Sequence, residues 1–544
     1  MNTIKRILLL AIAAGTTFLT QAQTGTYSWA NLPKVQVPVF KKDTINITKF
    51  GAKPDGITLN TEAINQAIDA CSKKGGGVVN IPQGVWMTGP IELKSNVNLH
   101  VSRSALLQFT SDKSQYKLIE SHFEGRKTVR NQAPISGTNL ENIAITGEGV
   151  IDANGDVWRA VKKDKLTEGE WKRLVASGGF VRQDGMMWYP SEAFMQAEEK
   201  KITVTGTTVK DYEVIKDFLR PNLLVLTNCK KVLLQGATFQ NSPAWCLHPI
   251  YCEHLTIDGV KVRNPSYAQN GDGLDIESCS YVEVKNSTLD CGDDGICIKS
   301  GKDEEGRKAG KASQYIIIRN NIVYHGHGGF VIGSEMSGGA HDIFVSDCTF
   351  IGTDIGLRFK TTRGRGGVVE NIYIRNINMR NIAHDAILFD MYYFAKASSL
   401  AMTNGKVEIP PVNEGTPQFR KFYISNVVCE GADRAMLIRG LPEMSIKDIY
   451  MSDVVIKSRR GVEVIEAQEV SLANVVLQCS ESAPLINIEN SRDLSFKKVT
   501  ALTTPKQFYS INGDRSKGIQ VDAEVEKSVI FNYGAEKTAV RSGK

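Results

Sequence analysis

Three kinds of feature are missing from this sequence, and each absence removes a class of protein. The ten cysteines form no CxxC pair and no His/Cys cluster with zinc-ligand spacing, which excludes the common zinc and dithiol sites. Lysine and arginine are scattered and form no nucleic-acid-binding motif. Outside residues 7–18, no apolar stretch is long enough to span a bilayer. We therefore expect neither a nucleic acid nor a membrane as a partner.

Proline is also scarce, with 17 prolines against 48 glycines in a chain of 544 residues. At 42% hydrophobic and 23% charged residues, the composition is that of a globular protein with many tight turns rather than a disordered one. The net charge of +6 is a mild excess, which suits a polyanionic ligand without requiring one.

The first residues are typical of an export signal. Two basic residues precede the apolar run of residues 7–18, and Thr-Gln-Ala at residues 20–22 supplies a small-x-small cleavage site. A buried first helix is the alternative, but the order of charge, apolar run and small residues favours export. We predict a signal peptide at residues 1–22, a mature chain of residues 23–544, and a periplasmic or extracellular location.

Short strand-like segments recur along most of the chain. Each begins with a polar residue, continues as three to five alternating β-formers, and passes through a small turn into a second run. The aligned apolar residues of the repeat are Val232, Leu255, Val282, Ile316, Ile343, Ile372, Phe422, Ile449, Val470 and Leu494. Neighbouring copies are 21 to 50 residues apart, mostly in the twenties.

A short period of strands is the sequence signature of a solenoid, and the alternation within each run requires strands. The sequence therefore predicts an all-β fold, a single-domain right-handed parallel β-helix whose coils stack about 4.8 Å apart. Cys229, Cys252 and Cys279 share one position of the repeat. Export would permit disulfides, but this shared position favours stacked small core residues.

The open end of such a stack needs a cap, and residues 50–71 are suited to form one. Asn60 or Thr61 is placed to cap a short helix. The apolar residues of this helix fall on one face, at Ile64, Ala67, Ile68 and Cys71. Two longer segments leave the solenoid: residues 158–220, an insertion of helical, polar and aromatic character that we expect to shape a cleft, and residues 394–419, a loop.

Three carboxylates recur at coil spacing. Asp272 lies 21 residues before Asp293, about one coil, and Asp294 follows directly. Gly292 and Gly295 flank the adjacent pair, so that a turn can present both side chains outward. Mutual repulsion should raise at least one pKa, which is the condition that glycoside hydrolysis requires of its acid. Turn residues and calcium ligands are the two alternatives for the same carboxylates.

Basic groups arrive on the next two coils. His327 stands between two glycines, 33 residues after Asp294. Arg358 and Lys360 lie on one face of a strand, with Phe359 inward. The two cations can pair with the carboxylates or clamp a carboxylate of a substrate.

These residues resemble the motifs of the polygalacturonase family, glycoside hydrolase family 28. The family is marked by NTD, G/QDD, GHG and RIK in that order on a right-handed β-helix. The corresponding triplets here are NGD at residues 270–272, GDD at 292–294, GHG at 326–328 and RFK at 358–360. Four ordered motifs make the resemblance specific. The stretch IKSGKDEEGRKAG is similar to that of the bacterial exo-acting and plant-type members rather than the fungal endo-acting ones.

The resemblance implies inverting hydrolysis of α-1,4-linked galacturonic acid without a metal or any other cofactor. Asp293 would be the general acid, and Asp272 and Asp294 would hold the attacking water. His327 would assist the acid. The remaining residues would contact the galacturonan substrate, namely Asn270, Arg358, Lys360 and Tyr392, with Tyr393 as a competitor for the last position.

The resemblance favours action from a chain end on polygalacturonate or oligogalacturonides, and we expect a monomer. Gly271, Phe359 and Gly295 depart from the family pattern without removing a charged group. The alternatives that stay open are the same chemistry on rhamnogalacturonan or a decorated galacturonan, a calcium-dependent pectate lyase, and a non-catalytic carbohydrate-binding β-helix.

Overall fold

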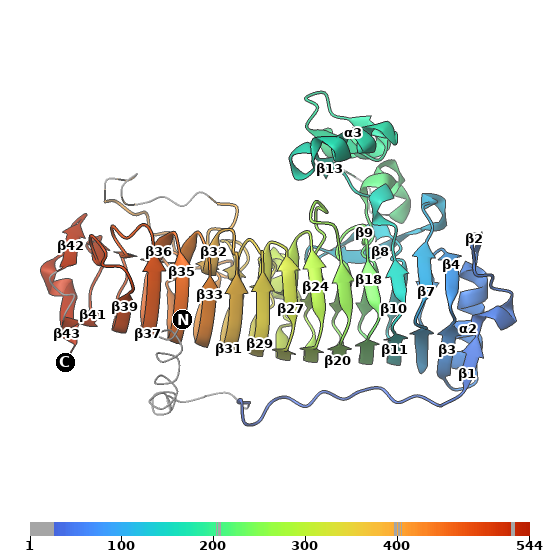
Figure 1. Cartoon of the computed structure of the whole chain (residues 1–544), viewed down its shortest axis with the longest axis horizontal. Coiled ribbons are helices and arrows are strands. Elements are labelled where there is room, and N and C mark those ends of the chain that lie inside the picture. Colours follow the sequence, from blue (N-terminus) through green and yellow to red (C-terminus); the bar gives the residue numbers. More distant parts are fainter. Residues whose placement is uncertain are drawn as a thin grey trace, which may run out of the picture.

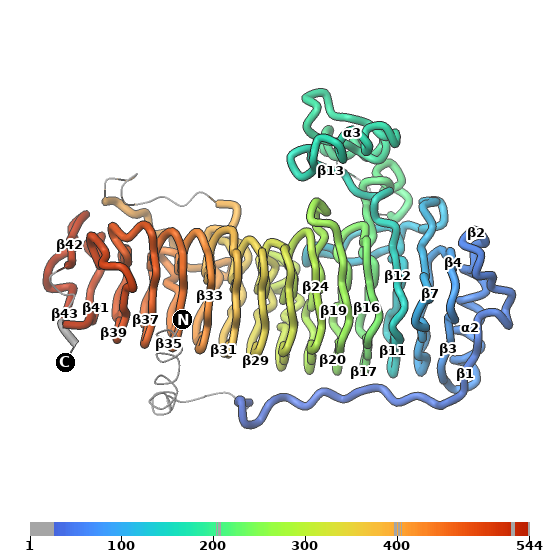
Figure 2. Tube along the Cα trace, viewed as in Figure 1, coloured from blue at the N-terminus to red at the C-terminus, as the bar shows by residue number. Residues whose placement is uncertain are grey.

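The computed structural model describes residues 27–543, except 203, 205–207, 396–399, 401–402, 404 and 524–527. The signal peptide predicted for residues 1–22 lies outside the described residues. The chain winds into a long stack of coils that advances steadily from the N-terminal to the C-terminal end (Figures 1 and 2). Within this part of the chain, no helix is long and apolar enough to cross a bilayer.

Two long sheets run along the stack, and every pairing within them is parallel. The 14-stranded sheet contains β5 (Ile91–Glu92), β10 (Ile135–Thr138), β16 (Leu224–Thr227), β19 (Leu247–Ile250), β22 (Leu274–Glu277), β25 (Asp294–Lys299), β28 (Gly328–Ile332), β30 (Leu357–Lys360), β32 (Asp385–Asp390), β34 (Arg434–Arg439), β36 (Arg460–Ile465), β38 (Ile486–Glu489), β40 (Tyr509–Asn512) and β42 (Val529–Asn532). These strands are hydrogen-bonded in chain order, so successive coils lie side by side.

The 24-stranded sheet forms the rest of the wall. Its strands are β1 (Thr44–Asn46), β2 (Asp55–Leu59), β3 (Gly77–Ile81), β4 (Gly84–Thr88), β6 (Val97–Val101), β7 (Ala105–Phe109), β11 (Glu141–Gly147), β12 (Val150–Asp152), β17 (Lys230–Gln235), β18 (Thr238–Gln240), β20 (Glu253–Asp258), β21 (Lys261–Arg263), β23 (Ser280–Lys285), β24 (Thr288–Cys291), β26 (Ser313–Arg319), β27 (Ile322–His325), β29 (Ala340–Ile351), β31 (Val368–Arg380), β33 (Gln418–Glu430), β35 (Ile446–Ser458), β37 (Ala467–Cys479), β39 (Ser495–Ala501), β41 (Ile519–Asp522) and β43 (Val540–Gly543).

The predicted right-handed parallel β-helix is confirmed, and so is the register of its repeat. Val232 pairs with Leu255, Leu255 with Val282, and the same apolar position continues from coil to coil as far as Val470. These side chains point inward and join one continuous core. All ten cysteines are buried and free, as expected for stacked core residues rather than disulfides.

The predicted helical cap is α2 (Thr61–Lys73), and its four expected apolar residues are buried against the first coils. Asn60 occupies the N-cap position, yet its side chain makes no capping hydrogen bond. Instead, its amide oxygen accepts from the Lys53 N–H at 2.7 Å and its amide nitrogen donates to the Met87 carbonyl at 3.1 Å. Asn60 therefore ties the entry loop to the first coil.

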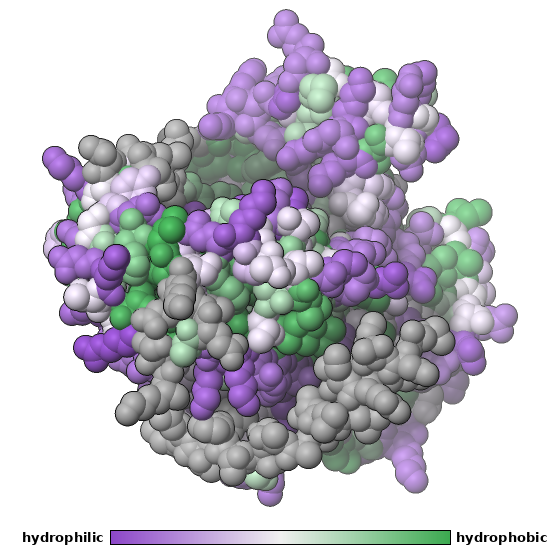
Figure 3. Space-filling view, turned by 60° about the vertical axis from the view of Figure 1, so that its left-hand side comes forward, coloured by the Kyte–Doolittle hydropathy of each residue, from purple (hydrophilic) through white to green (hydrophobic). Residues whose placement is uncertain are grey.

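Between β12 and β16, the chain leaves the solenoid as the projecting lobe at the top of Figure 1. The lobe contains η3 (Gly155–Val157), β13 (Val161–Lys162), η4 (Lys163–Lys165), α3 (Glu168–Ala176), β14 (Phe180–Val181), β15 (Met187–Tyr189), α4 (Glu192–Glu199) and η5 (Val209–Phe218). Its three short strands are antiparallel, and its outer surface is mostly hydrophilic (Figure 3).

A second departure was not anticipated from the sequence. Strands β8 (Leu118–Phe123) and β9 (Arg126–Asn131) form an antiparallel hairpin that lies over the outer face of the 14-stranded sheet. Its tip meets the segment after β25, which includes α5 (Asp303–Ala309). The remaining short helical turns are η1 (Ile47–Phe50), η2 (Lys113–Gln115) and η7 (Lys537–Ala539).

Candidate active site

Three carboxylates converge where β22 and β25 begin. Leu274 pairs with Ile296 in the parallel ladder, which sets Asp272 level with Asp294 on the next coil. One carboxylate oxygen from each of Asp272, Asp293 and Asp294 lies within 4.8 Å of the other two. The coil spacing therefore brings together the three residues that the sequence predicted as an acid cluster.

The glycines around the pair serve close packing rather than an unusual backbone angle. A Cβ on Gly295 would lie 2.5 Å from the Val323 side chain, and one on Gly292 would lie 2.5 Å from the Pro265 carbonyl oxygen. Both contacts are impossible for a real side chain, so the turn needs glycine at both positions. With this packing, Asp294 is buried and Asp293 remains partly exposed.

Asp294 is held between two cations from β30. Arg358 Nη1 donates to Oδ1 at 3.0 Å, and Lys360 Nζ donates to Oδ2 at 2.7 Å. Burial alone would raise the pKa of Asp294, but the charges of Lys360 and Arg358 outweigh it and hold that pKa well below the ordinary value. Asp294 is therefore ionised, with both oxygens engaged.

Asp272 has the opposite environment. Its side chain is buried, and burial, followed by the charges of Asp275 and Asp293, raises its pKa well above the ordinary value. Burial also raises the pKa of Asp275, to about 8, against the opposing charge of Lys299. Asp272 and Asp275 are thus two buried carboxyl groups beside an ionised Asp294. In both, burial and the neighbouring negative charge favour the protonated form.

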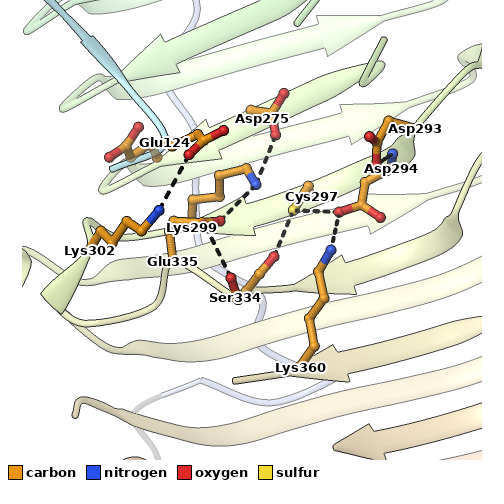
Figure 4. A network of polar contacts seen from close by, with 12 residues as sticks. Glu124, Asp275, Asp293, Asp294, Cys297, Lys299, Lys302, Ser334, Glu335 and Lys360 are labelled. Atoms are coloured by element: carbon orange, nitrogen blue, oxygen red, sulfur yellow. Dashed lines mark hydrogen bonds and ion pairs between the residues drawn. The ribbon is translucent and has the colours of Figure 1, made fainter. Parts of the chain in front are cut away.

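Figure 4 shows how Lys299 contributes to this cluster. Its Nζ lies 3.6 Å from Asp275 Oδ1 and 3.2 Å from Glu335 Oε2, and all three side chains are buried. In the same view, Cys297 lies beside Asp294, with Sγ 3.8 Å from Oδ2. The sequence motifs identified neither Lys299 nor Glu335, because the contacts join segments on successive coils.

His327 stands level with Asp293 on the next coil and contacts it directly. Its Nδ1 lies 2.9 Å from Asp293 Oδ1, and its Nε2 lies 3.7 Å from Asp354 Oδ2. The hydrogen bond with Asp293 raises the pKa of His327 above 6.5, against the lowering effect of burial. Asp354 is a further carboxylate of the site that sequence reasoning missed.

The other predicted residues divide into two groups. Asn270, in a left-handed backbone conformation just before Asp272, accepts a 2.8 Å hydrogen bond from buried Arg220 and so lies at the site. Tyr392 does not: its ring lies against Arg363 and Arg439, 5.2 and 5.6 Å from the two guanidinium carbons.

The tyrosine beside the catalytic candidates is Tyr393. Its ring centroid lies 4.9 Å from Lys360 Nζ and 5.8 Å from the Arg358 guanidinium carbon. Tyr393, the competitor for that position, is therefore the tyrosine that meets the two cations, and a substrate contact of Tyr392 stays a prediction. The strand β32 ends at Asp390. In the turn that follows, side chains no longer alternate between the two faces of the sheet, so the sequence does not predict which tyrosine faces the site.

The hairpin β8–β9 packs on the outer face of the 14-stranded sheet, on the N-terminal side of the carboxylates. Phe123 packs on Trp245 with ring centroids 4.9 Å apart, and His122 packs on Tyr251 at 5.8 Å. Trp245 and Tyr251 flank β19, the strand next to β22, and Trp245 is buried. The Glu-Gly turn between two runs of β-formers, FEGRKTV, was the available signal for this hairpin.

The three clustered carboxylates are also the group of described residues best placed to approach a metal ion. A calcium ion takes six to eight oxygen ligands. Both oxygens of Asp294 instead face Arg358 and Lys360, and these two cations already balance its charge. The donor set thus fits a protonated acid cluster better than a calcium site.

Comparisons with known proteins agree with this geometry. The family model of glycosyl hydrolases family 28 matches residues 71–416, which include every residue of the site. The exo-poly-alpha-D-galacturonosidase of Dickeya chrysanthemi is 28% identical over 459 residues, covering 82% of this chain and 70% of that protein. The crystal structure of a hyperthermoactive exopolygalacturonase from Thermotoga maritima has a TM-score of 0.68 at 32% identity, covering 81% of this chain and 93% of that one. A probable polygalacturonase of Vitis vinifera is 28% identical over 421 residues, 76% of this chain and 74% of its own.

Proposed function

The chain belongs to family 28 of the glycosyl hydrolases, and on that premise we propose that it is an exo-acting polygalacturonase. Its substrate would be polygalacturonate or oligogalacturonides, and its reaction the hydrolysis of α-1,4-galacturonosyl linkages with inversion. The observation that carries the proposal is the cluster in which Asp293 lies between a buried Asp272 and an Asp294 that is fully paired with Arg358 and Lys360.

In the proposed reaction, Asp293 protonates the glycosidic oxygen as the bond to the leaving sugar breaks. It is the most exposed of the three carboxylates and the one in contact with His327. Its proton is returned after the product leaves, and His327, as the hydrogen-bonded neighbour, is suited to assist that exchange. Proton transfer of this kind contributes about 10²–10⁴-fold to a rate.

Asp272 and Asp294 would hold the water that attacks the anomeric carbon. Asp272 in its ionised form, whose raised pKa makes it the stronger base of the two, would accept the proton that this water loses as its oxygen bonds to the carbon. The nearest oxygens of the three carboxylates lie within 4.8 Å of one another, which is less than the roughly 6.5–9.5 Å that separates the two carboxyl groups of a typical inverting enzyme. Even so, Asp294 is a poor nucleophile, because Lys360 and Arg358 occupy both of its oxygens. A paired carboxylate can still orient a water molecule, so inversion remains the outcome that we propose.

The substrate carboxylate would be bound by the part of Arg358 that Asp294 leaves free. Both hydrogen bonds of the Arg358 side chain to described residues come from Nη1, to Asp294 and to the His327 carbonyl. The rest of the guanidinium can meet a uronate, and Tyr393 supplies an adjacent aromatic face for the sugar ring. A neutral sugar offers no partner to this cation, which favours galacturonan over a neutral chain.

Exo-action is supported by the hairpin β8–β9, which covers residues on either side of β19, one strand away from Asp272, and would thereby close one end of the substrate groove. Its tip is anchored by an ion pair between Arg126 and Asp303 and by Lys302 Nζ, 3.3 Å from Glu124 Oε2. A groove closed at one end admits a chain end rather than the middle of a polymer. Export to the periplasm or the cell exterior, where pectic chains occur, is the location that we propose.

Product analysis on defined oligogalacturonides tests the proposal. We expect saturated mono- or digalacturonate as the first product, released from one end, with inverted anomeric configuration by NMR in the first minutes. Random internal cleavage would contradict the exo mode, and a retained anomer would contradict the role given to Asp294. Activity on rhamnogalacturonan without activity on galacturonan would contradict the proposed substrate and leave the proposed hydrolytic mechanism in place.

A further inference from the structure

A second concave site lies on the N-terminal side of the hairpin, away from the catalytic carboxylates. It is a cavity of about 770 Å³ between the hairpin β8–β9 and the outward faces of β5, β10 and β16. This volume is in the range of pockets that bind small ligands, roughly 300–1,000 Å³. The reaction proposed above makes no use of it.

The cavity is separate from the catalytic groove because the hairpin is sealed onto β19 between them. His248, which points outward from β19, is fully buried, and Trp245 is 2% exposed. Phe123 of the hairpin packs on Trp245, whose ring packs in turn on His248, and His122 packs on Tyr251 at the other end of β19. A ligand in the cavity therefore cannot reach Asp272 or Asp293 along the sheet surface without displacing the hairpin.

The wall of the cavity carries an arginine, Arg130, whose side chain contacts an aromatic ring and a carbonyl rather than a carboxylate. Arg130 is 9% exposed, and among the described residues no carboxylate lies within ion-pair distance of its guanidinium. The guanidinium carbon of Arg130 lies 3.7 Å from the ring centroid of Phe123, and its Nη2 donates a hydrogen bond to the main-chain carbonyl of Arg220. Burial, followed by the charge of Arg220, lowers the pKa of Arg130 against the charge of Glu124, and the charge of a bound anion would add to the effect of Glu124.

Other wall residues are suited to a sugar. Asn131, Gln132 and Asn222 present amides to the lining, and Ser136 and Thr138 add hydroxyl groups. The side-chain oxygens of Asn131 and Asn222 have no hydrogen-bond partner although they are buried, which leaves acceptors that a small side-chain rotation could offer to a ligand hydroxyl. Tyr212 supplies an aromatic face.

The titratable side chains around the cavity are also mainly basic. They are Lys94, Lys117, Lys127 and Arg130 against Glu92 and Glu120, with His122 as the only histidine. Glu92 is already engaged, since its carboxylate accepts from Gln132 at 3.0 Å and lies 4.0 Å from Lys94. The balance favours an anionic ligand over a neutral or cationic one.

We propose that this cavity is a non-catalytic binding site for a short uronate oligosaccharide, of the size of digalacturonate. A carboxylate of the ligand pairs with Arg130, its hydroxyls meet the amides of Asn131 and Asn222, and one sugar face packs on Tyr212. The choice of a galacturonate rests on the proposed function, because that reaction would release such molecules beside the cavity.

Calorimetric titration of the inactive Asp293→Asn chain with digalacturonate tests the inference. We expect two binding events, one of which persists when Lys360→Met is added to impair the catalytic groove. Arg130→Gln should weaken that persistent event by at least ~10-fold, as expected for loss of a charge-assisted pair. The neutral disaccharide α-1,4-galactobiose should not bind at this site.

A second variant guards against loss of folding, because Arg130 is buried. Thr138→Trp places a large side chain at the exposed rim of the cavity, and Thr500→Trp, on exposed β39 far along the chain, is its matched control. Thr138→Trp should abolish the second event and Thr500→Trp should leave it unchanged. Equal binding in both variants would overturn the inference.

Kinetics on polygalacturonate separates this inference from the proposed function. If Arg130→Gln and Thr138→Trp raise the KM for hydrolysis in proportion to the lost binding, the cavity is a continuation of the catalytic groove and the separate site is refuted. If the wild-type chain hydrolyses galacturonan but shows a single binding event, the inference fails and the function stands. If it binds at the cavity without hydrolysing galacturonan, the function alone fails.

Discussion

Lys360 donates a 2.7 Å hydrogen bond from Nζ to Oδ2 of Asp294, across 66 residues of sequence and within the buried wall of the groove. Both side chains are almost fully enclosed, at 6% and 2% exposure. The pair sets the ionisation of one carboxylate at the site and leaves its neighbours to carry the proton.

Replacing Lys360 with methionine should move the acid limb of the pH profile upward. In the folded chain the pKa of Asp294 is depressed, so its ionised form contributes stability above the unfolded pKa and loses it as the pH falls through the folded pKa. Without Lys360, burial dominates and the pKa of Asp294 rises. We expect kcat/KM to fail at a higher pH than in the wild type, and stability to drop by about 3–5 kcal/mol.

The control for Lys360→Met is Lys308→Met. Lys308 pairs with Glu304 on the surface, where both side chains are largely exposed, and such a pair contributes less than about 1 kcal/mol. Both variants would be followed by thermal unfolding and by pH–rate profiles. An unshifted acid limb in Lys360→Met would show that Asp294 does not need to be ionised for turnover.

Asp293→Asn should remove hydrolysis and leave the fold intact, because the side chain is partly exposed and keeps its shape. We expect the rate of reducing-end release from polygalacturonate to fall by about 10²–10⁴-fold or more. Asp290→Asn is the matched control: Asp290 lies near the site in sequence but pairs with exposed His325 at 2.8 Å. Comparable rates in Asp293→Asn and the wild type would end the hydrolase assignment of this residue.

His327 should govern the alkaline limb. Its pKa is raised by Asp293, so the interaction is complete below the unfolded value of 6.5 and is lost as the pH rises through the higher folded value. In His327→Gln we expect a lower kcat/KM, and we expect the alkaline limb of its pH profile to no longer follow the deprotonation of a histidine. NMR titration of the wild-type histidine would check the direction of the shift, and His325→Gln should leave the profile unchanged.

Tyr393→Ala should raise the KM for oligogalacturonides, by roughly 3–30-fold, since the ring faces both Arg358 and Lys360. Tyr392→Ala should reduce thermal stability instead, because that ring packs against the core and Arg363. Steady-state kinetics and melting curves of the two variants give the comparison. The reverse result, a KM effect confined to Tyr392→Ala, would restore the tyrosine first predicted from the sequence.

Removing divalent cations should not change the rate. Both oxygens of Asp294 face cations of the chain itself, which leaves Asp272 and Asp293 short of the six to eight oxygens that calcium takes. We expect equal activity with and without a chelator, and products without the absorbance of an unsaturated uronide. Loss of activity that added calcium restores would favour the lyase alternative.

Much of this molecule can be predicted from its sequence because, in a solenoid, residues at the same position of the repeat lie next to one another on adjacent coils. Val232 and Leu255 share a motif position in the chain and a rung in the ladder, and the same rule brings Asp272 level with Asp294. The helical cap follows from apolar spacing in the same way. Asn60 is the exception there, since its amide serves the loop and not the helix end.

Loops follow no such rule. Tyr392 and Tyr393 are adjacent after the end of β32, and only the path of the turn decides which ring meets Lys360. The hairpin β8–β9 has a readable turn, yet nothing in its residues states that it lies across β19. Lys299 ends β25, and it meets Glu335 across 36 residues because the loop after β28 brings Glu335 back to the same wall.

The sequence alone therefore determined the coil, its register and the row of charged side chains on one face, because each depends on spacing along a repeating strand. The tertiary structure decided which oxygen of Asp294 meets which cation, which carboxyl group keeps a proton, and where the groove is closed. Those outcomes depend on burial and on distances of a few ångströms between loops, and neither quantity is encoded in a period.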